Sequence, residues 1–105
     1  MNAAKIMRAL IEKGLYGSNL KELSSLAEQS FDQCPALYGS LLYVFKSLDA
    51  EHEKYSGQGL PAERYKEVVE LLTQPLLAVL SADVESPGQL LDALNTLHAA
   101  LYKLW

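Results

Sequence analysis

Apolar side chains recur at intervals of three and four residues along almost the whole chain, and this spacing limits the possible folds more than any other feature. No segment alternates apolar and polar residues as a half-buried strand does. The longest run places seven residues on one seam of a helix: Cys34, Tyr38, Leu41, Phe45, Leu48, His52 and Tyr55. The sequence therefore predicts an all-helical protein.

Glycine, proline and capping residues divide this pattern into separate helices. Gly14 is suited to ending the first helix, and Asn19 with Glu22 has the spacing of a capping pair at the start of the second. Pro35 and Pro87 are suited to the first positions of later helices. We expect a compact bundle of four to five antiparallel helices, at about 3–13, 19–31, 35–55, 61–82 and 87–104.

Glycines and a proline at three further places affect this prediction. The segment 56–60 contains two glycines and predicts a flexible connector within a single domain of residues 1–105. Pro75 predicts a kink in the helix 61–82, with two shorter helices as the alternative. Gly39 inside a helix costs about 1 kcal/mol relative to alanine. It predicts either the close approach of another helix or a tolerated irregularity.

Length, charge and cysteine content exclude several classes of protein. A chain of 105 residues is long enough to bury one core, and its net charge of -4 does not suit binding to nucleic acid phosphates. Its apolar stretches are shorter than the roughly 20 residues that cross a bilayer. A single cysteine and a charged N-terminal segment lack the pattern of a secreted protein. We therefore expect a cytoplasmic protein that binds neither nucleic acid nor membrane.

Few residues are candidates for chemistry. Cys34 precedes a helix start, where the helix dipole favours a reactive thiolate, but a lone cysteine more often packs as a small apolar group. Asp49 and His52 have the spacing of one of the two carboxylate-x-x-His pairs of a helical di-iron site, whereas His98 has Asn95 at the matching position. No catalytic, cofactor-binding or metal-binding set can be assembled, so we expect a protein that is not an enzyme.

Charged residues are scarce in two parts of the chain. Residues 33–45 contain none, and residues 71–105 contain only four. Either these helices are central in the bundle, or an apolar face is covered by another chain, and we favour the second interpretation. The interface candidates are Leu42, Tyr43, Val44, Leu76, Leu77, Leu91, His98 and Tyr102.

These observations favour a small non-enzymatic module for protein–protein interaction that works through an apolar helical face. It would form a homodimer, or bind an unidentified protein partner as an adaptor or inhibitor. In size and bundle architecture the chain is similar to small bacterial accessory proteins, including bacteriocin immunity proteins. The alternative is a carrier that holds a small apolar ligand between helices near Pro75.

Overall fold

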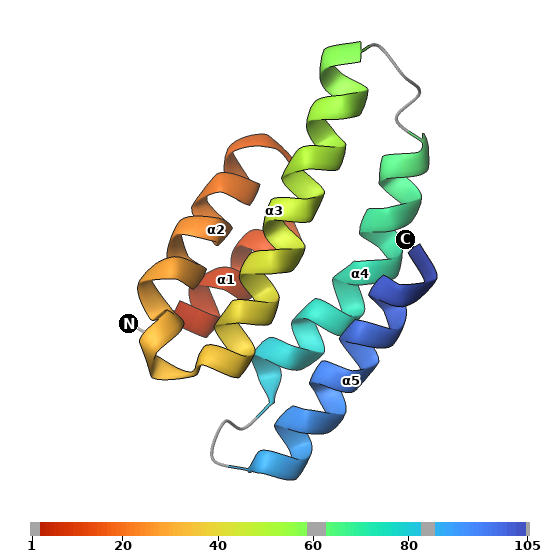
Figure 1. Ribbon diagram of the computed structural model, residues 1–105. Helices are drawn as coiled ribbons and strands as arrows, with labels where there is room; N and C mark the ends of the chain where they lie inside the picture. The colour runs from red at the N-terminus through yellow and green to blue at the C-terminus, as the bar shows by residue number, and fades with distance from the viewer. Residues whose placement is uncertain (1–2, 59–62, 83–85, 105) are drawn as a thin grey trace.

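A computed structural model of the chain describes residues 3–58, 63–82 and 86–104, and these are almost entirely helical. They form five α-helices and one short 3-10 helix, and they contain no strand (Figure 1). The elements are α1 (Ala3–Lys13), α2 (Gly17–Ser30), η1 (Phe31–Gln33), α3 (Pro35–Gln58), α4 (Glu63–Ser81) and α5 (Pro87–Leu104). The predicted all-helical bundle is confirmed.

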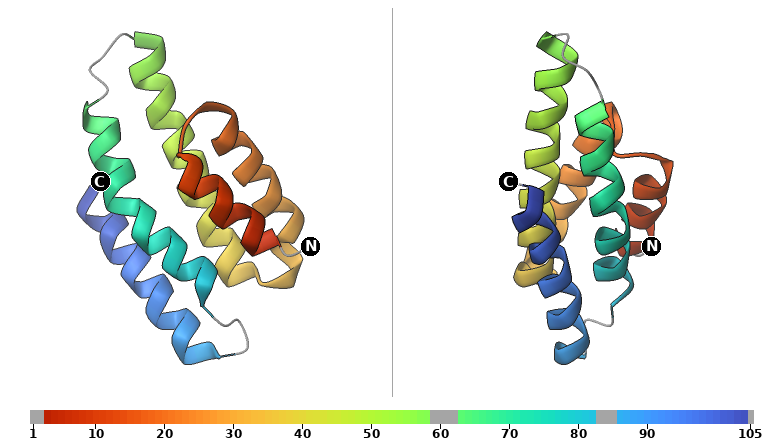
Figure 2. Two further views of the ribbon diagram at one scale, coloured as in Figure 1. Left: turned by 180° about the vertical axis from the view of Figure 1, so that it is seen from behind. Right: turned by 90° about the vertical axis from the view of Figure 1, so that its right-hand side faces the viewer.

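Successive helices alternate in direction, and the first four form a ring (Figure 1). Within this ring, α1 contacts α2 and α4, while α3 contacts α2 and α4. Helix α5 packs mainly on α4 and touches α3, so it lies at one edge of the molecule. Figure 2 shows α3 and α5 on one side of the bundle and α1 on the other.

Leucine dominates a single hydrophobic core that all five α-helices supply. The predicted seam of α3 points into it, since Tyr38, Leu41, Phe45 and Leu48 are buried. The two flanking seam residues Cys34 and His52 are half-buried. The side chain of the seventh, Tyr55, lies outside the described residues. Each of the two buried seam leucines contributes about 1.5–3 kcal/mol, and Leu37 and Val44 of α3 are buried beside the seam.

Several predicted helix ends are confirmed. Gly14 has a φ of +138°, and its N–H donates to the carbonyls of Leu10 and Ile11, both at 3.2 Å, so it ends α1. Helix α5 begins at Pro87, and the Leu90 N–H donates to the Ser86 carbonyl at 3.1 Å. Helix α4 continues through Pro75, so this segment is one helix rather than two.

The start of α2 differs from the prediction. The helix begins at Gly17 instead of residue 19, directly after the extended residue Tyr16, whose side chain makes no capping bond. The side-chain amide of Asn19 donates from Nδ2 to the Gly14 carbonyl at 3.1 Å, so its expected capping pair with Glu22 is wrong. The cause is Gly17, whose φ of +50° lets the chain turn sharply and enter the helix earlier.

Helix α3 is longer than expected, and its glycine has a different neighbour. The helix extends to Gln58, so residues 56–58 of the predicted connector are helical, while 59–60 lie outside the described residues. A Cβ atom at Gly39 would lie 3.3 Å from Cε2 of Phe31. The close contact at Gly39 is therefore the ring of a residue in η1 instead of another long helix.

Candidate binding surfaces around helix α5

Helix α5 combines an edge position with an unusually uncharged surface. Its inward side buries Leu90, Leu94, Leu97 and Leu101 in the core. Of its 18 residues, only Asp92 and Lys103 carry a charge. A helix at the edge of a soluble bundle normally presents a charged outer face. The two flanks of α5 are therefore the first places to look for a binding surface.

One flank of α5 forms a shallow hollow with α3. This hollow has a volume of about 250 Å³ and is lined by Tyr43 of α3 and by His98, Leu101 and Tyr102 of α5. The two tyrosine side chains are 60% and 90% exposed, respectively. Leu91 is also exposed and lies on the same stripe of α5, seven residues before His98.

A hydrogen bond between Ser40 and His98 joins the two helices beside this hollow. The Ser40 Oγ and His98 Nε2 atoms are 3.3 Å apart. A serine beside a histidine can act as a nucleophile and base, but acyl transfer also needs donors for the oxyanion. Ser40 lies inside α3, where the helix uses the neighbouring backbone N–H groups. The contact between Ser40 and His98 therefore serves to position α5 against α3.

We call Ser40, Tyr43, Leu91, His98 and Tyr102 the α3/α5 face.

The eight predicted interface residues fall into three groups. Tyr43, Leu91, His98 and Tyr102 are exposed, and three of them line one hollow. Leu42 and Leu77 are half-buried against the core. Val44 and Leu76 are fully buried, so their placement at the surface needs correction. Both belong to the hydrophobic core, as the alternative interpretation of these uncharged helices expects.

The opposite flank of α5 forms a second hollow with α4, beside Pro75. This hollow has a volume of about 240 Å³. It is lined by Leu71, Pro75, Thr96, Ala99, Ala100 and Lys103. Leu71 is 55% exposed at its rim. The sequence predicted a site near Pro75 but not the other residues that line this hollow. Leu71 precedes Pro75 by four residues and therefore lies on the same face of α4.

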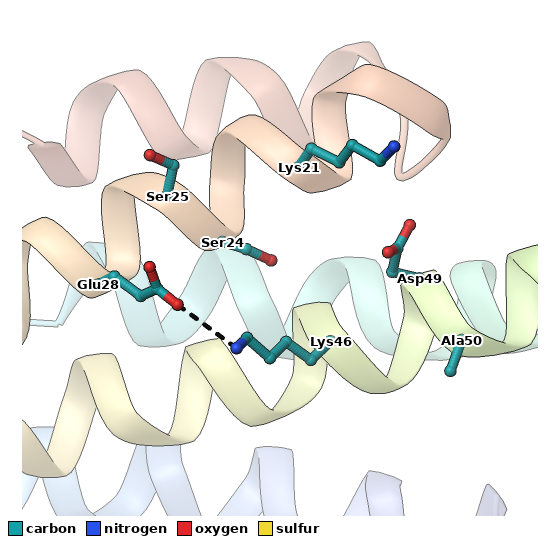
Figure 3. Close-up of a pocket in the computed structure, with 7 residues that line it drawn as sticks. All are labelled: Lys21, Ser24, Ser25, Glu28, Lys46, Asp49 and Ala50. Carbon is teal, nitrogen blue, oxygen red and sulfur yellow. Dashed lines mark ion pairs between the residues drawn. The ribbon is translucent and has the colours of Figure 1, made fainter.

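A third hollow lies between α2 and α3, and six of its seven lining residues have polar or charged side chains (Figure 3). It has a volume of about 450 Å³. Lys46 of α3 pairs with Glu28 of α2 at 3.4 Å, and Lys21 and Asp49 point toward each other farther along. Both side chains of the ion pair are more than half exposed, and such pairs contribute about 0–1 kcal/mol. The charges balance within the groove, so it offers no selective site for an anion or a cation.

A cluster of three rings lies at the end of the bundle where the α1–α2 link meets α3 and α4. The ring centroids of Tyr16, His52 and Tyr65 lie 5.3–6.2 Å apart. The Tyr65 hydroxyl donates to the Leu15 carbonyl. Burial raises the pKa of Tyr65 above its ordinary value, and the nearby Tyr16 and Asp49 raise it further. Tyr65 therefore stays neutral at physiological pH and acts as a structural donor.

Cys34 stands at the junction of η1 and α3. Its side chain is half-buried and packs against the core, and its carbonyl accepts the Tyr38 N–H at 3.0 Å. Burial raises the pKa of Tyr38, and Cys34 contributes a smaller increase. These contacts fit the apolar-packing interpretation of the cysteine, and its reactivity as a thiol stays a prediction.

Metal-ligand clusters and membrane-spanning helices are both absent from the described part of the chain. Among the described residues, no three His, Cys, Asp or Glu side chains lie close enough together to hold a metal ion. None of the helices described has both the length and the apolar character that crossing a membrane requires. Comparison of the chain with family models, with curated proteins and with solved structures finds no match.

Proposed function

We propose that this protein is a non-enzymatic interaction module that forms a homodimer through the α3/α5 face. The observation that carries the proposal is a pair of exposed tyrosines, Tyr43 and Tyr102, that line one hollow between α3 and the sparsely charged edge helix α5. The centres of protein interfaces are enriched in tyrosine and poor in charged residues. Tyrosine also supplies a large contact area at a small cost in side-chain entropy.

A second copy of the chain is an occupant that the uncharged character of this face permits. Each chain has a net charge of -4, so two copies repel one another, but salt screens exposed charges that lie more than about 8–10 Å apart. None of the five residues of the α3/α5 face carries a formal charge when histidine is neutral. Tyrosine hydroxyls, the serine hydroxyl and imidazole can each donate and accept hydrogen bonds. The polar groups of the face could therefore pair with their own copies across a two-fold axis.

The size of the molecule is compatible with this pairing. It measures 44 × 28 × 19 Å, and a standard interface buries about 800 Å² on each partner. The stripe from Leu91 to Tyr102 on α5 extends over about 16 Å at 1.5 Å per residue. This length supplies the apolar centre of an interface, and polar residues around it would form the rim.

Sedimentation velocity of the wild type and of three aspartate variants tests the homodimer. We expect the wild type to sediment with twice the mass of one chain, and Tyr43→Asp and Tyr102→Asp to sediment as folded monomers. Leu71→Asp is the matched control, because it places the same charge on an exposed apolar residue of the other flank. Circular dichroism would verify that each variant is folded.

Two results would contradict parts of this proposal. A wild type that stays monomeric at a concentration of about 100 µM would rule out the homodimer. The α3/α5 face would then be proposed to bind a different protein, for which this chain would be an adaptor or an inhibitor. A dimer that survives both tyrosine substitutions would place the interface elsewhere.

The proposed setting is the cytoplasm, because the one cysteine of the chain cannot form an internal disulfide. A second candidate function, transport of a small apolar ligand, is favoured by one observation. The hollow between α4 and α5 lies directly beside Pro75, where the sequence predicts such a site.

A further inference from the structure

The hollow between α4 and α5 is chemically asymmetric. Four of its six lining residues are apolar: Leu71, Pro75, Ala99 and Ala100. The other two are Thr96 and Lys103, and Lys103 is the only charged residue among the six. A site of this composition suits a ligand that has an apolar part and one negative charge.

Small side chains and a proline create the apolar part of the hollow. Ala99 and Ala100 of α5 are too short to fill the space in front of α4. Pro75 has no N–H to donate to the carbonyl of Leu71, which belongs to the same wall. The volume of about 240 Å³ equals that of about eight water-sized groups, since each occupies about 30 Å³ in the liquid. The hollow therefore accommodates a short alkyl chain.

The polar atoms of the hollow favour a carboxylate. The Thr96 hydroxyl already donates to the Asp92 carbonyl at 3.0 Å, so its hydrogen is occupied. The Lys103 ammonium group has three hydrogen-bond donors and a full positive charge. None of the six lining residues is acidic, and no ion pair of Lys103 is found among the described residues. One cation without a competing acid favours a monoanion over a dianion or a cation.

We propose that this hollow binds a small amphiphilic carboxylate with an alkyl chain of about six to eight carbons. The chain would lie against Leu71, Pro75, Ala99 and Ala100, and the carboxylate would accept hydrogen bonds from the Lys103 Nζ. This site lies on the flank of α5 opposite the α3/α5 face. The proposal therefore makes the second candidate function specific and does not depend on the homodimer.

The test is an NMR titration of the full chain with sodium octanoate, followed in ¹H–¹⁵N spectra below the micellar concentration. We expect saturable shifts of the amide signals of Leu71, Thr96, Ala99, Ala100 and Lys103. The same titrations with 1-octanol and with octylammonium separate the tail from the charge. Octanol should bind about three- to fivefold more weakly than octanoate, as expected for an exposed charge pair, and octylammonium more weakly still.

Three variants assign the two parts of the ligand to the hollow. Lys103→Met keeps the apolar stem of the side chain, so it should reduce octanoate affinity about three- to fivefold and leave octanol affinity unchanged. Ala100→Phe fills the hollow and should abolish binding of both; Ala99→Leu serves the same purpose if Ala100→Phe fails to fold. Tyr43→Asp is the control, because it disrupts the α3/α5 face without adding a charge to the helix that carries Lys103, and it should bind octanoate like the wild type.

Each opposite result would overturn the proposal. Equal affinities for octanol and octanoate, or an octanoate affinity that Lys103→Met does not change, would remove the carboxylate from the ligand. Shifts concentrated at Tyr43 and His98 would show that the amphiphile binds the α3/α5 face instead. Octanoate binding that persists in both hollow-filling variants would exclude the hollow as the site.

Discussion

Replacing Tyr65 by phenylalanine removes one hydroxyl group and should reveal how much the hydrogen bond from Tyr65 to Leu15 contributes to stability. Tyr65 is buried in α4, and its hydroxyl donates to the Leu15 carbonyl, 50 residues earlier in the chain. Phenylalanine retains the ring contacts with Tyr16 and His52 but leaves this carbonyl without its donor. Leaving a buried acceptor unpaired costs about 1–3 kcal/mol.

This loss can be measured by thermal unfolding followed by circular dichroism. For a domain of this length, 1 kcal/mol corresponds to a change in Tm of about 4 °C, so Tyr65→Phe should lower Tm by about 4–12 °C. Tyr102→Phe is the matched control, because that hydroxyl is on a side chain 90% exposed and its removal should change stability by less than about 0.5 kcal/mol.

The pH dependence of the same variant gives a second, independent readout. The pKa of Tyr65 is higher in the folded protein than its ordinary value of about 10, chiefly because of burial. Its contribution to stability is therefore fully present below pH 10 and is lost as the pH rises above that value. The wild type should lose stability above pH 10 more steeply than Tyr65→Phe. Tyr38, whose pKa is also raised, keeps some of this dependence in the variant.

Two results would refute this reasoning. If Tyr65→Phe and Tyr102→Phe unfold at the same temperature, the hydrogen bond to Leu15 contributes nothing to stability. If Tyr65→Phe and the wild type have the same alkaline slope, Tyr65 does not titrate with a raised pKa in the folded state.

Three further substitutions test other parts of the structure. Val44→Asp places an unpaired charge in the core and should abolish the helical circular dichroism signal. Tyr43→Asp, at the exposed neighbouring position, should stay folded. Gly14→Ala should destabilise the protein by about 1–3 kcal/mol in urea unfolding because of its positive φ; Gly88→Ala, with open space around it, should be neutral or stabilising. Pro75→Ala restores a donor to the Leu71 carbonyl and should raise Tm, and an unchanged or lower Tm would contradict that reasoning.

The sequence could predict those features that depend on local geometry. The periodicity of α3 identified the buried seam. Gly14 and Pro87 marked helix ends correctly, because each of these ends depends on the conformational preferences of one residue. The start of α2 could not be predicted in the same way. It depends on the turn at Gly17 and on a bond from Asn19 back to Gly14, which competes with the local capping pair.

The candidate surfaces could be predicted only in part, for a related reason. Residues 41–45 are apolar through more than a full turn, so periodicity alone does not decide which of them face the core. The ring of helices buries Val44 and leaves Tyr43 exposed. The hollow beside Pro75 depends on which residues of α5 stand opposite Leu71, and that register is set by packing over the whole length of α4 and α5.

The edge position of α5 also has a consequence for how the protein assembles. The ring of α1 to α4 closes through its own contacts, and α5 is joined to it mainly through α4. When α5 then docks on α4, it completes both candidate binding surfaces in a single step. Partial opening of the folded protein should follow the reverse order. Hydrogen exchange is then expected to be faster at the backbone amides of α5 than at those of α3. In the partly opened state, both candidate binding surfaces would be lost while most of the core stays intact.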